Sequence, residues 1–350
     1  MKMIIFDEPT AVLTEAEADN LLKTMKSIAD EGIAILFITH RLDEVLEISD
    51  NITIVRDGNH IATKSREDTS VSELAELMVG RKIEKITRTT DTEQKEVIMD
   101  IKDLVVHMPG EKVDGVNLKI KKGEILGVGG LAGHGKVGIS NGIMGLYPSK
   151  GQVLINGEKL IMNNPKKSMA QQLAFVSEDR RGVGLLLDDS IEMNIVITAI
   201  HNQDKYMHKV GPFKMKNSGE IRQHVLKMIK DLDIRCTGPT QIVRHLSGGN
   251  QQKVCIARAL TMNPGILFVS EPTRGIDVGA KRLVLDTLVK LNKELEMTIV
   301  MTSSELGELR SICDRIAIVT EGKIAGVLKP DAPDAEYGLL MSGQKGMKGA

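Results

Sequence analysis

A glycine-rich loop that ends in lysine is the clearest candidate for chemistry in this sequence. Residues 130–137 read GLAGHGKV and follow an apolar run at 124–128. Glycine lets the backbone approach an anion closely, free N–H groups at a helix start can hold phosphate oxygens, and lysine adds a positive charge. The spacing matches the phosphate-loop pattern G-x4-G-K. The predicted phosphate-binding residues are Gly130, Gly133, His134, Gly135, Lys136 and Val137.

The last of these residues departs from the pattern. Val137 stands where the phosphate-loop pattern ends in serine or threonine, whose hydroxyl binds Mg²⁺. The loop is therefore predicted to bind phosphate but to hold a metal ion weakly.

A second glycine-rich turn lies downstream. Residues 246–254 read LSGGNQQKV, and a helix is predicted from Gln251 to about Met262. A serine hydroxyl and the N–H groups at a helix start are suited to phosphate oxygens. The candidate ligand-binding residues in this turn are Ser247, Gly248, Gly249 and Gln251.

Carboxylates follow two similar apolar runs, one at each end of the sequence. Asp7 and Glu8 follow residues 3–6, and Ser270 and Glu271 follow residues 266–269. Each run reads as a buried parallel strand that delivers an acidic side chain at its carboxyl end. A helix and a second apolar strand come next in both places, and these second strands lead to His40 and Ser304. The pattern predicts an internal repeat of a whole domain, with a complete second copy and a partial first copy.

Together these segments resemble the tandem ATP-binding subunits of ABC sugar importers of the ribose/galactose type. The resemblance rests on residues 9–14, 246–253, 271–281 and 303–305. It implies an α/β fold of the P-loop NTPase class, ABC type. That fold has a parallel core sheet, an antiparallel β region and an inserted helical lobe. It also implies that the turn at 246–254 closes over nucleotide bound by a facing domain.

The same resemblance implies ATP and Mg²⁺ as cofactors and assigns roles to the acidic residues. Asp7 would orient Mg²⁺, Glu8 would polarise the attacking water, and His40 would contact the γ-phosphate. Glu271 is the corresponding catalytic carboxylate of the second copy, with Ser304 at the position of His40. Because Val137 and Ser270 replace metal-binding groups, the second site is expected to bind nucleotide but to hydrolyse it slowly. Glu178, in the segment 175–182, occupies the place of a γ-phosphate sensor.

The predicted domain organisation has four parts. Residues 1–80 form the C-terminal part of a first domain, 81–96 a linker, 97–335 a complete second domain and 336–350 a disordered tail. Because the chain starts within a predicted core strand, truncation of a longer tandem protein is expected, with a misplaced start favoured over a degraded gene or a natural fragment.

Composition limits the other function classes. The 350 residues are 41% hydrophobic and 27% charged, the net charge is −1, and aromatic residues make up 2%. Such a balance predicts neither general nucleic-acid binding nor a membrane span, and three scattered cysteines predict reduced thiols. The resemblance implies a location at the cytoplasmic face of the membrane. The implied partners are permease subunits, indirectly an extracytoplasmic sugar-binding protein, and another ABC domain or chain.

Two alternative functions stay open at this point, and a third is disfavoured. A nucleoside importer would use the same kind of subunit. A non-hydrolysing nucleotide-binding scaffold would fit the replaced metal ligands. A ribosome-associated tandem protein would need a longer charged insert than the linker at 81–96 provides.

Overall fold

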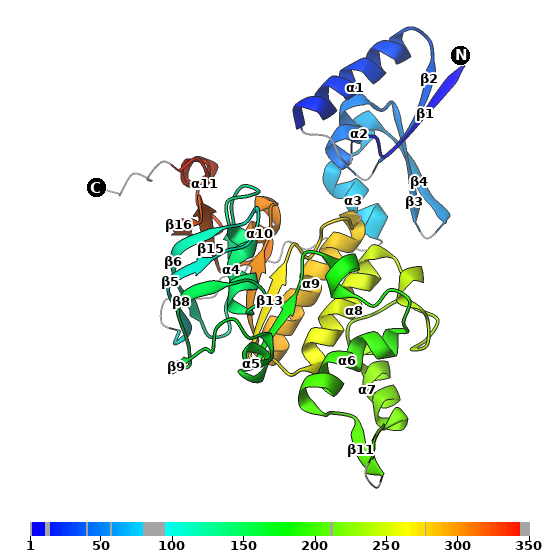
Figure 1. The fold of residues 1–350 in the computed structure, drawn as a ribbon. Coiled ribbons are helices and arrows are strands. Elements are labelled where there is room, and N and C mark those ends of the chain that lie inside the picture. The colour runs from blue at the N-terminus through cyan, green and yellow to red at the C-terminus, as the bar shows by residue number, and fades with distance from the viewer. Residues whose placement is uncertain are drawn as a thin grey trace. The chain divides into compact units, whose positions relative to one another are not determined.

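The computed structural model of the chain describes residues 2–10, 15–39, 41–56, 58–79, 95–210, 213–276 and 278–343. The chain divides into two compact units. Unit 1 comprises Met1–Lys85 and Asp277–Arg282, and unit 2 comprises Ile86–Ile276 and Leu283–Ala350. Figure 1 labels the elements of both units. Within the described ranges, no helix is long and apolar enough to cross a membrane.

Unit 2 is built on a six-stranded sheet of order β10-β13-β14-β7-β15-β16. The first five strands are parallel, and β16 pairs antiparallel with β15. β7, β13 and β14 are buried along their whole length, as expected for a parallel sheet covered on both faces. The bounds are Ile125–Gly129 for β7, Leu173–Val176 for β10, Ile266–Ser270 for β13, Thr298–Thr302 for β14, Arg315–Thr320 for β15 and Lys323–Leu328 for β16.

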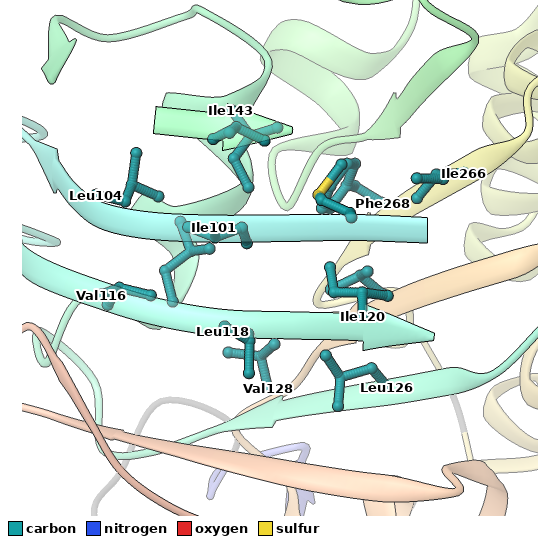
Figure 2. Close-up of a cluster of buried hydrophobic side chains, with 14 of the residues drawn as sticks. Ile101, Leu104, Val116, Leu118, Ile120, Leu126, Val128, Ile143, Ile266 and Phe268 are labelled. Atoms are coloured by element: carbon teal, nitrogen blue, oxygen red, sulfur yellow. The ribbon is translucent and has the colours of Figure 1, made fainter. Parts of the chain in front are cut away.

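A four-stranded antiparallel sheet of order β6-β5-β8-β9 packs against one side of this core. Figure 2 shows the apolar side chains of Ile101, Leu118 and Ile120 together with Leu126 and Val128 of β7. The burial of these side chains stabilises the two sheets against each other by the hydrophobic effect. The bounds are Val97–Val106 for β5, Val113–Lys121 for β6, Ser149–Ile155 for β8 and Glu158–Lys159 for β9.

Helices make up most of the segment between β10 and β13. α8 runs Gly248–Thr261 and packs on α6, which runs Ile191–Gln203. Other elements of this segment are α7 (Ser218–Asp231) and a hairpin of β11 (Met207–Val210) and β12 (Phe213–Lys216). The remaining helices that belong wholly to this unit are α4 (Lys136–Ile143), α5 (Pro165–Ala170), α10 (Leu306–Ile312) and α11 (Asp334–Met341), and α9 spans Val278–Leu295. The predicted fold, a parallel core with an antiparallel region and a helical insert, is confirmed.

Unit 1 contains two separate two-stranded sheets. β1 and β2 are parallel, and β3 and β4 are antiparallel. β1 runs Met3–Asp7, α1 Glu15–Asp30, β2 Ala34–Ile38, α2 Leu42–Ile48, β3 Asn51–Arg56, β4 Asn59–Ser65 and α3 Val71–Val79. β1, α1 and β2 confirm the strand, helix and second strand predicted at the start of the chain.

The prediction that the first apolar run is a buried strand is wrong. Met3 and Ile5 of β1 are 56% and 61% exposed, and Leu36 and Ile38 of β2 are 48% and 46% exposed. The reason is that β1 pairs with β2 alone, and alternate side chains of both strands have no covering layer in the described part of unit 1.

The same local hydrogen bonds and backbone angle nevertheless occur in each of the two units. Glu8 N donates to Ile38 O at 2.8 Å, and Glu271 N donates to Thr302 O at 2.8 Å. Both glutamates have a φ of 45°. A threonine two residues after each glutamate donates to a buried glutamate on the second helix downstream, α2 or α10, at 2.8 Å for Thr10–Glu44 and 2.6 Å for Thr273–Glu308. The similarity predicted from the two apolar runs therefore extends to their hydrogen bonds.

The predicted linker and the predicted tail have different outcomes. The predicted linker at 81–96 lies almost wholly outside the described residues. The predicted tail from residue 336 is wrong up to Met341, because α11 packs on β15 and β16 and buries Tyr337. Its hydroxyl donates to Lys329 O at 2.8 Å, and the Arg310 guanidinium lies over its ring at 5.4 Å from the ring centroid.

Replacing Tyr337 tests this correction. Tyr337→Ala should lower the free energy of unfolding of unit 2 by about 3 kcal/mol, because a large aromatic side chain leaves a cavity. Tyr337→Phe should cost about 1 kcal/mol, the contribution of one hydrogen bond. Urea unfolding followed by circular dichroism measures both variants. Equal, wild-type stability of both would mean that α11 is not packed.

Candidate phosphate site

The glycine-rich loop connects the central strand β7 to helix α4 in unit 2. Gly130 has a φ of 147°, and a Cβ at this position would lie 2.3 Å from Val319 O. Gly135 caps α4 with a φ of 96°, in the left-handed region. Only glycine fits both positions, so the loop glycines hold the backbone N–H groups of the loop at the start of α4.

Lys136 is the first residue of α4, and its side chain is only 2% exposed. Its Nζ donates to Gly130 O at 3.1 Å and lies 3.9 Å from Glu271 Oε1. The lysine therefore crosses its own loop and brings a buried positive charge to the end of β13. Loop N–H groups and this charge together favour an anion.

Glu271 and Ser304, predicted as partners in one site, are brought together by the structure. Ser304 Oγ donates to Glu271 Oε1 at 2.6 Å, and Ser304 N donates to Glu271 Oε2 at 3.2 Å. Parallel β13 and β14 end side by side, and this is why residues 33 positions apart meet. The two bonds orient the carboxylate next to Lys136.

The metal-binding side of the site is weaker than the phosphate side. Val137 is buried and has no metal ligand to offer, and Ser270 is fully buried. Ser270 and Thr302 are register partners on β13 and β14, and neither side-chain hydroxyl has a hydrogen-bond partner. These hydroxyls and Glu271 are oxygen donors of the kind Mg²⁺ accepts. The described residues contain no cluster of three acidic, histidine or cysteine side chains.

The fit of the loop to an anion is demonstrated by a residue that the sequence interpretation missed. Glu111 Oε1 accepts from Gly133 N at 2.8 Å, and its Oε2 accepts from Gly135 N at 2.9 Å and from Val137 N at 3.2 Å. A carboxylate thus takes the place that phosphate oxygens would have. No local pattern marks Glu111, because its partners are 22–26 residues away in sequence.

His134 lies in the same loop, but its side chain faces elsewhere. Its Nδ1 accepts from Glu321 N at 3.4 Å, and its carbonyl accepts from Gly322 N at 2.9 Å. These contacts tie the loop to the turn between β15 and β16. These contacts do not support the predicted ligand role of the His134 side chain, and the His134 N–H donates to Leu131 O at 3.3 Å.

The second glycine-rich turn is placed differently from its prediction. α8 starts at Gly248, so the two glycines form the first helical turn instead of preceding it. Asn250 Nδ2 donates to Ser247 Oγ at 2.9 Å. A Cβ on Gly248 would lie 3.2 Å from Gly275 O, which places this turn beside the loop that follows Glu271.

Gln251 does not reach the surface of this turn. It is buried, and its Nε2 donates to Val243 O at 3.2 Å. The predicted ligand role of its side chain is therefore not supported by its placement. Further along α8, burial raises the pKa of the Cys255 thiol to about 12, so this cysteine stays protonated at neutral pH.

Three of the remaining predicted residues lie in the described part of the chain. Glu178 follows β10, at the same sheet edge as Glu271, and its Oε2 accepts from Ser177 Oγ at 3.4 Å. Asp7 and Glu8 are exposed at the end of β1 in unit 1. His40 lies outside the described residues. The described residues of unit 1 contain no phosphate loop.

Fold and loop together define a P-loop nucleotide-binding protein, and comparison with known proteins gives the family. Residues 113–274 match the family described as ABC transporter. The ribose import ATP-binding protein RbsA of Clostridium tetani is 36% identical over 336 residues, which cover 96% of this chain and 65% of that protein. The nucleoside import ATP-binding protein NupA of Lactococcus lactis subsp. cremoris is 37% identical over 345 residues, covering 97% and 67%.

Further relatives extend the same picture. The xylose import ATP-binding protein XylG of Thermoanaerobacter pseudethanolicus is 37% identical over 342 residues, covering 96% of this chain and 66% of that protein. The dimeric, post-hydrolysis ATP-binding cassette MJ0796 bound to ADP and Pi is 26% identical, with a TM-score of 0.55, and covers 67% of this chain and 100% of that chain. The chain belongs to the ATP-binding proteins of ABC transporters. It spans about two thirds of the length of the relatives it matches.

Removal of the loop lysine should weaken nucleotide binding. Lys136→Ala should lower ATP affinity about tenfold or more, because hydrogen bonds to charged groups contribute about 1.5–3 kcal/mol. Lys166→Ala, at an exposed lysine of α5, is the matched control. Equilibrium binding of a fluorescent ATP analogue measures both. Unchanged affinity of Lys136→Ala would contradict a role for this loop in binding.

Proposed function

We propose that this chain couples ATP binding and hydrolysis to the import of a monosaccharide through an ABC transporter. The observation that carries the proposal is the set of loop N–H groups holding a carboxylate, next to buried Lys136 and the Glu271–Ser304 pair. The names of relatives such as RbsA and XylG support a sugar as the cargo.

In this proposal the polar groups divide phosphate binding, water activation and metal binding among them. The N–H groups of Gly133, Gly135 and Val137 bind phosphate oxygens, and Lys136 neutralises part of their charge. Ser304 holds the Glu271 carboxylate in position to polarise an attacking water. Mg²⁺ would neutralise charge on the phosphates, and the Ser270 and Thr302 hydroxyls would offer it oxygen ligands in unit 2.

The proposed partners follow from the transporter class. Permease subunits would receive the chain at the cytoplasmic face of the membrane, and an extracytoplasmic sugar-binding protein would act indirectly. The turn at Ser247–Gly249 would close over nucleotide bound to another ABC domain or chain. Its position beside Gly275 suits a surface that meets a facing domain.

We further propose that unit 1 corresponds to the C-terminal half of another ABC cassette, the first domain of the predicted tandem. In unit 2, β7 lies between β14 and β15. The described part of unit 1 has no strand between β2 and β3. Instead, a hollow of about 1100 Å³ lies there, lined by both strands together with Met25, Leu74 and Met78. A strand that carries a phosphate loop would fit this hollow. Asp7, Glu8 and His40 would then serve that nucleotide site.

A non-hydrolysing nucleotide-binding scaffold is the second candidate function. It is favoured because Val137 replaces a hydroxyl ligand and Ser270 replaces a carboxylate, and a metal shell without that hydroxyl and that carboxylate neutralises less charge during phosphoryl transfer. Nucleotide binding alone would satisfy this candidate.

Restoring the metal ligands separates the two candidates. The double variant Val137→Thr and Ser270→Asp should raise ATP turnover about tenfold, if the added ligands stabilise the transition state by about 1.4 kcal/mol. Thr is nearly isosteric with Val, so Val137→Thr alone controls for packing. Phosphate release with permease subunits present is the measurement. No turnover in either form, with ATP still bound, would favour the scaffold.

The cargo is tested separately from the chemistry. Vesicles that contain the chain and its permease subunits should take up a labelled pentose or hexose only with ATP. Labelled nucleoside is the control cargo. Uptake of nucleoside instead of sugar would transfer the proposal to the nucleoside importers, the class to which NupA belongs.

A further inference from the structure

The segment that carries Glu111 lies directly across the phosphate loop. A Cβ on Gly135 would lie 2.3 Å from Lys112 O, and one on Gly138 would lie 2.1 Å from Glu111 O. Glycines at these positions therefore permit close contact with the backbone of 110–112 as well as with a ligand. This contact fixes the position from which the Glu111 side chain extends.

The backbone around Glu111 is held independently of its carboxylate. Glu111 N donates to Met108 O at 3.2 Å, and Asp114 N donates to Gly322 O at 2.8 Å. Gly322 in turn donates to His134 O at 2.9 Å. Rotation of the half-buried Glu111 side chain alone would thus release the loop N–H groups, without a change in the fold around them.

The carboxylate covers only one part of the site. It accepts from Gly133, Gly135 and Val137, whereas Lys136 Nζ donates to Gly130 O and lies beside Glu271. A nucleotide phosphate would compete for the same three N–H groups and would gain the Lys136 charge in addition. The two anions cannot share these donors, because each N–H points to one position.

We propose that Glu111 is a built-in competitor of the nucleotide phosphate and sets the nucleotide affinity of this site. The inference rests on the proposed function, since it requires that the loop binds nucleotide. When Glu111 occupies the binding groups in part of the population, the apparent affinity for nucleotide equals the intrinsic affinity multiplied by the fraction of molecules whose groups are free. Glu111 thereby keeps the site selective for ligands with several phosphate charges, which can displace it, over singly charged anions.

Variants of Glu111 test the proposal by binding. Glu111→Gln keeps the shape and removes the charge, and Glu111→Ala removes the side chain. Both should raise ATP affinity about tenfold in the full chain. Glu158→Gln, at an exposed glutamate of β9, controls for the change in net charge. Unchanged or lower affinity in both Glu111 variants would overturn the proposal.

A second measurement needs no nucleotide. Amide hydrogen exchange at Gly133, Gly135 and Val137 should be slow in the wild type and faster in Glu111→Ala. Equal exchange rates in the two proteins would overturn the contact itself.

The two proposals fail in distinguishable ways. Wild-type ATP binding that depends on Lys136, with no effect of Glu111, would leave the proposed function standing and remove the competitor. Absence of ATP binding in every variant, with exchange still dependent on Glu111, would overturn the proposed function, and competition with nucleotide would fall with it.

Discussion

Close backbone contact at a few glycines is the constraint on which the site depends. Gly130 lies against Val319 O, and Gly135 and Gly138 lie against the backbone of 111–112. A methyl group at any of these positions would force the loop away from β15 or from the segment before β6. The N–H groups of the loop would then lose their common direction, and an anion site built from them would be lost. The surrounding sheets serve mainly to hold these contacts in place.

The burial of Lys136 beside the partly buried Glu271 creates a second dependence. Removing two charges from water costs several kcal/mol, which hydrogen bonds and mutual attraction must offset. Gly130 O and Ser304 supply those hydrogen bonds, and the short Lys136–Glu271 separation supplies the attraction. The pair therefore depends on the ends of β7, β13 and β14 lying side by side. By contrast, the end of β13 carries the neutral, unpartnered hydroxyl of Ser270 in place of a carboxylate, with the unpartnered Thr302 hydroxyl on the next strand. The groups at this sheet edge therefore suit a phosphate anion better than a metal ion.

Much of this arrangement could be predicted from the sequence. The phosphate loop, the parallel strands of unit 2 and the meeting of Glu271 with Ser304 all follow from short motifs placed at strand ends. Such motifs carry their geometry locally. The strand, helix and second strand at the start of unit 1 were also predictable from the sequence.

The remaining features depend on tertiary contacts that the sequence pattern does not encode. Exposure of β1 depends on which strands surround it, and an apolar run reads the same in both cases. α11 is short, and only the burial of Tyr337 distinguishes it from a polar tail. Glu111 contacts a loop more than 20 residues away, so no spacing rule identifies it. The start of α8 at Gly248 was missed because glycine is a poor helix former.

The central claim is that the loop N–H groups bind nucleotide phosphate. Titration of the isotopically labelled chain with ATP, followed by amide ¹H–¹⁵N spectra, tests this most directly. The account predicts saturable shifts centred on the amides of Gly133, Gly135 and Val137, with smaller changes along α4. Shifts centred elsewhere, or no change at these three amides at saturating ATP, would contradict it.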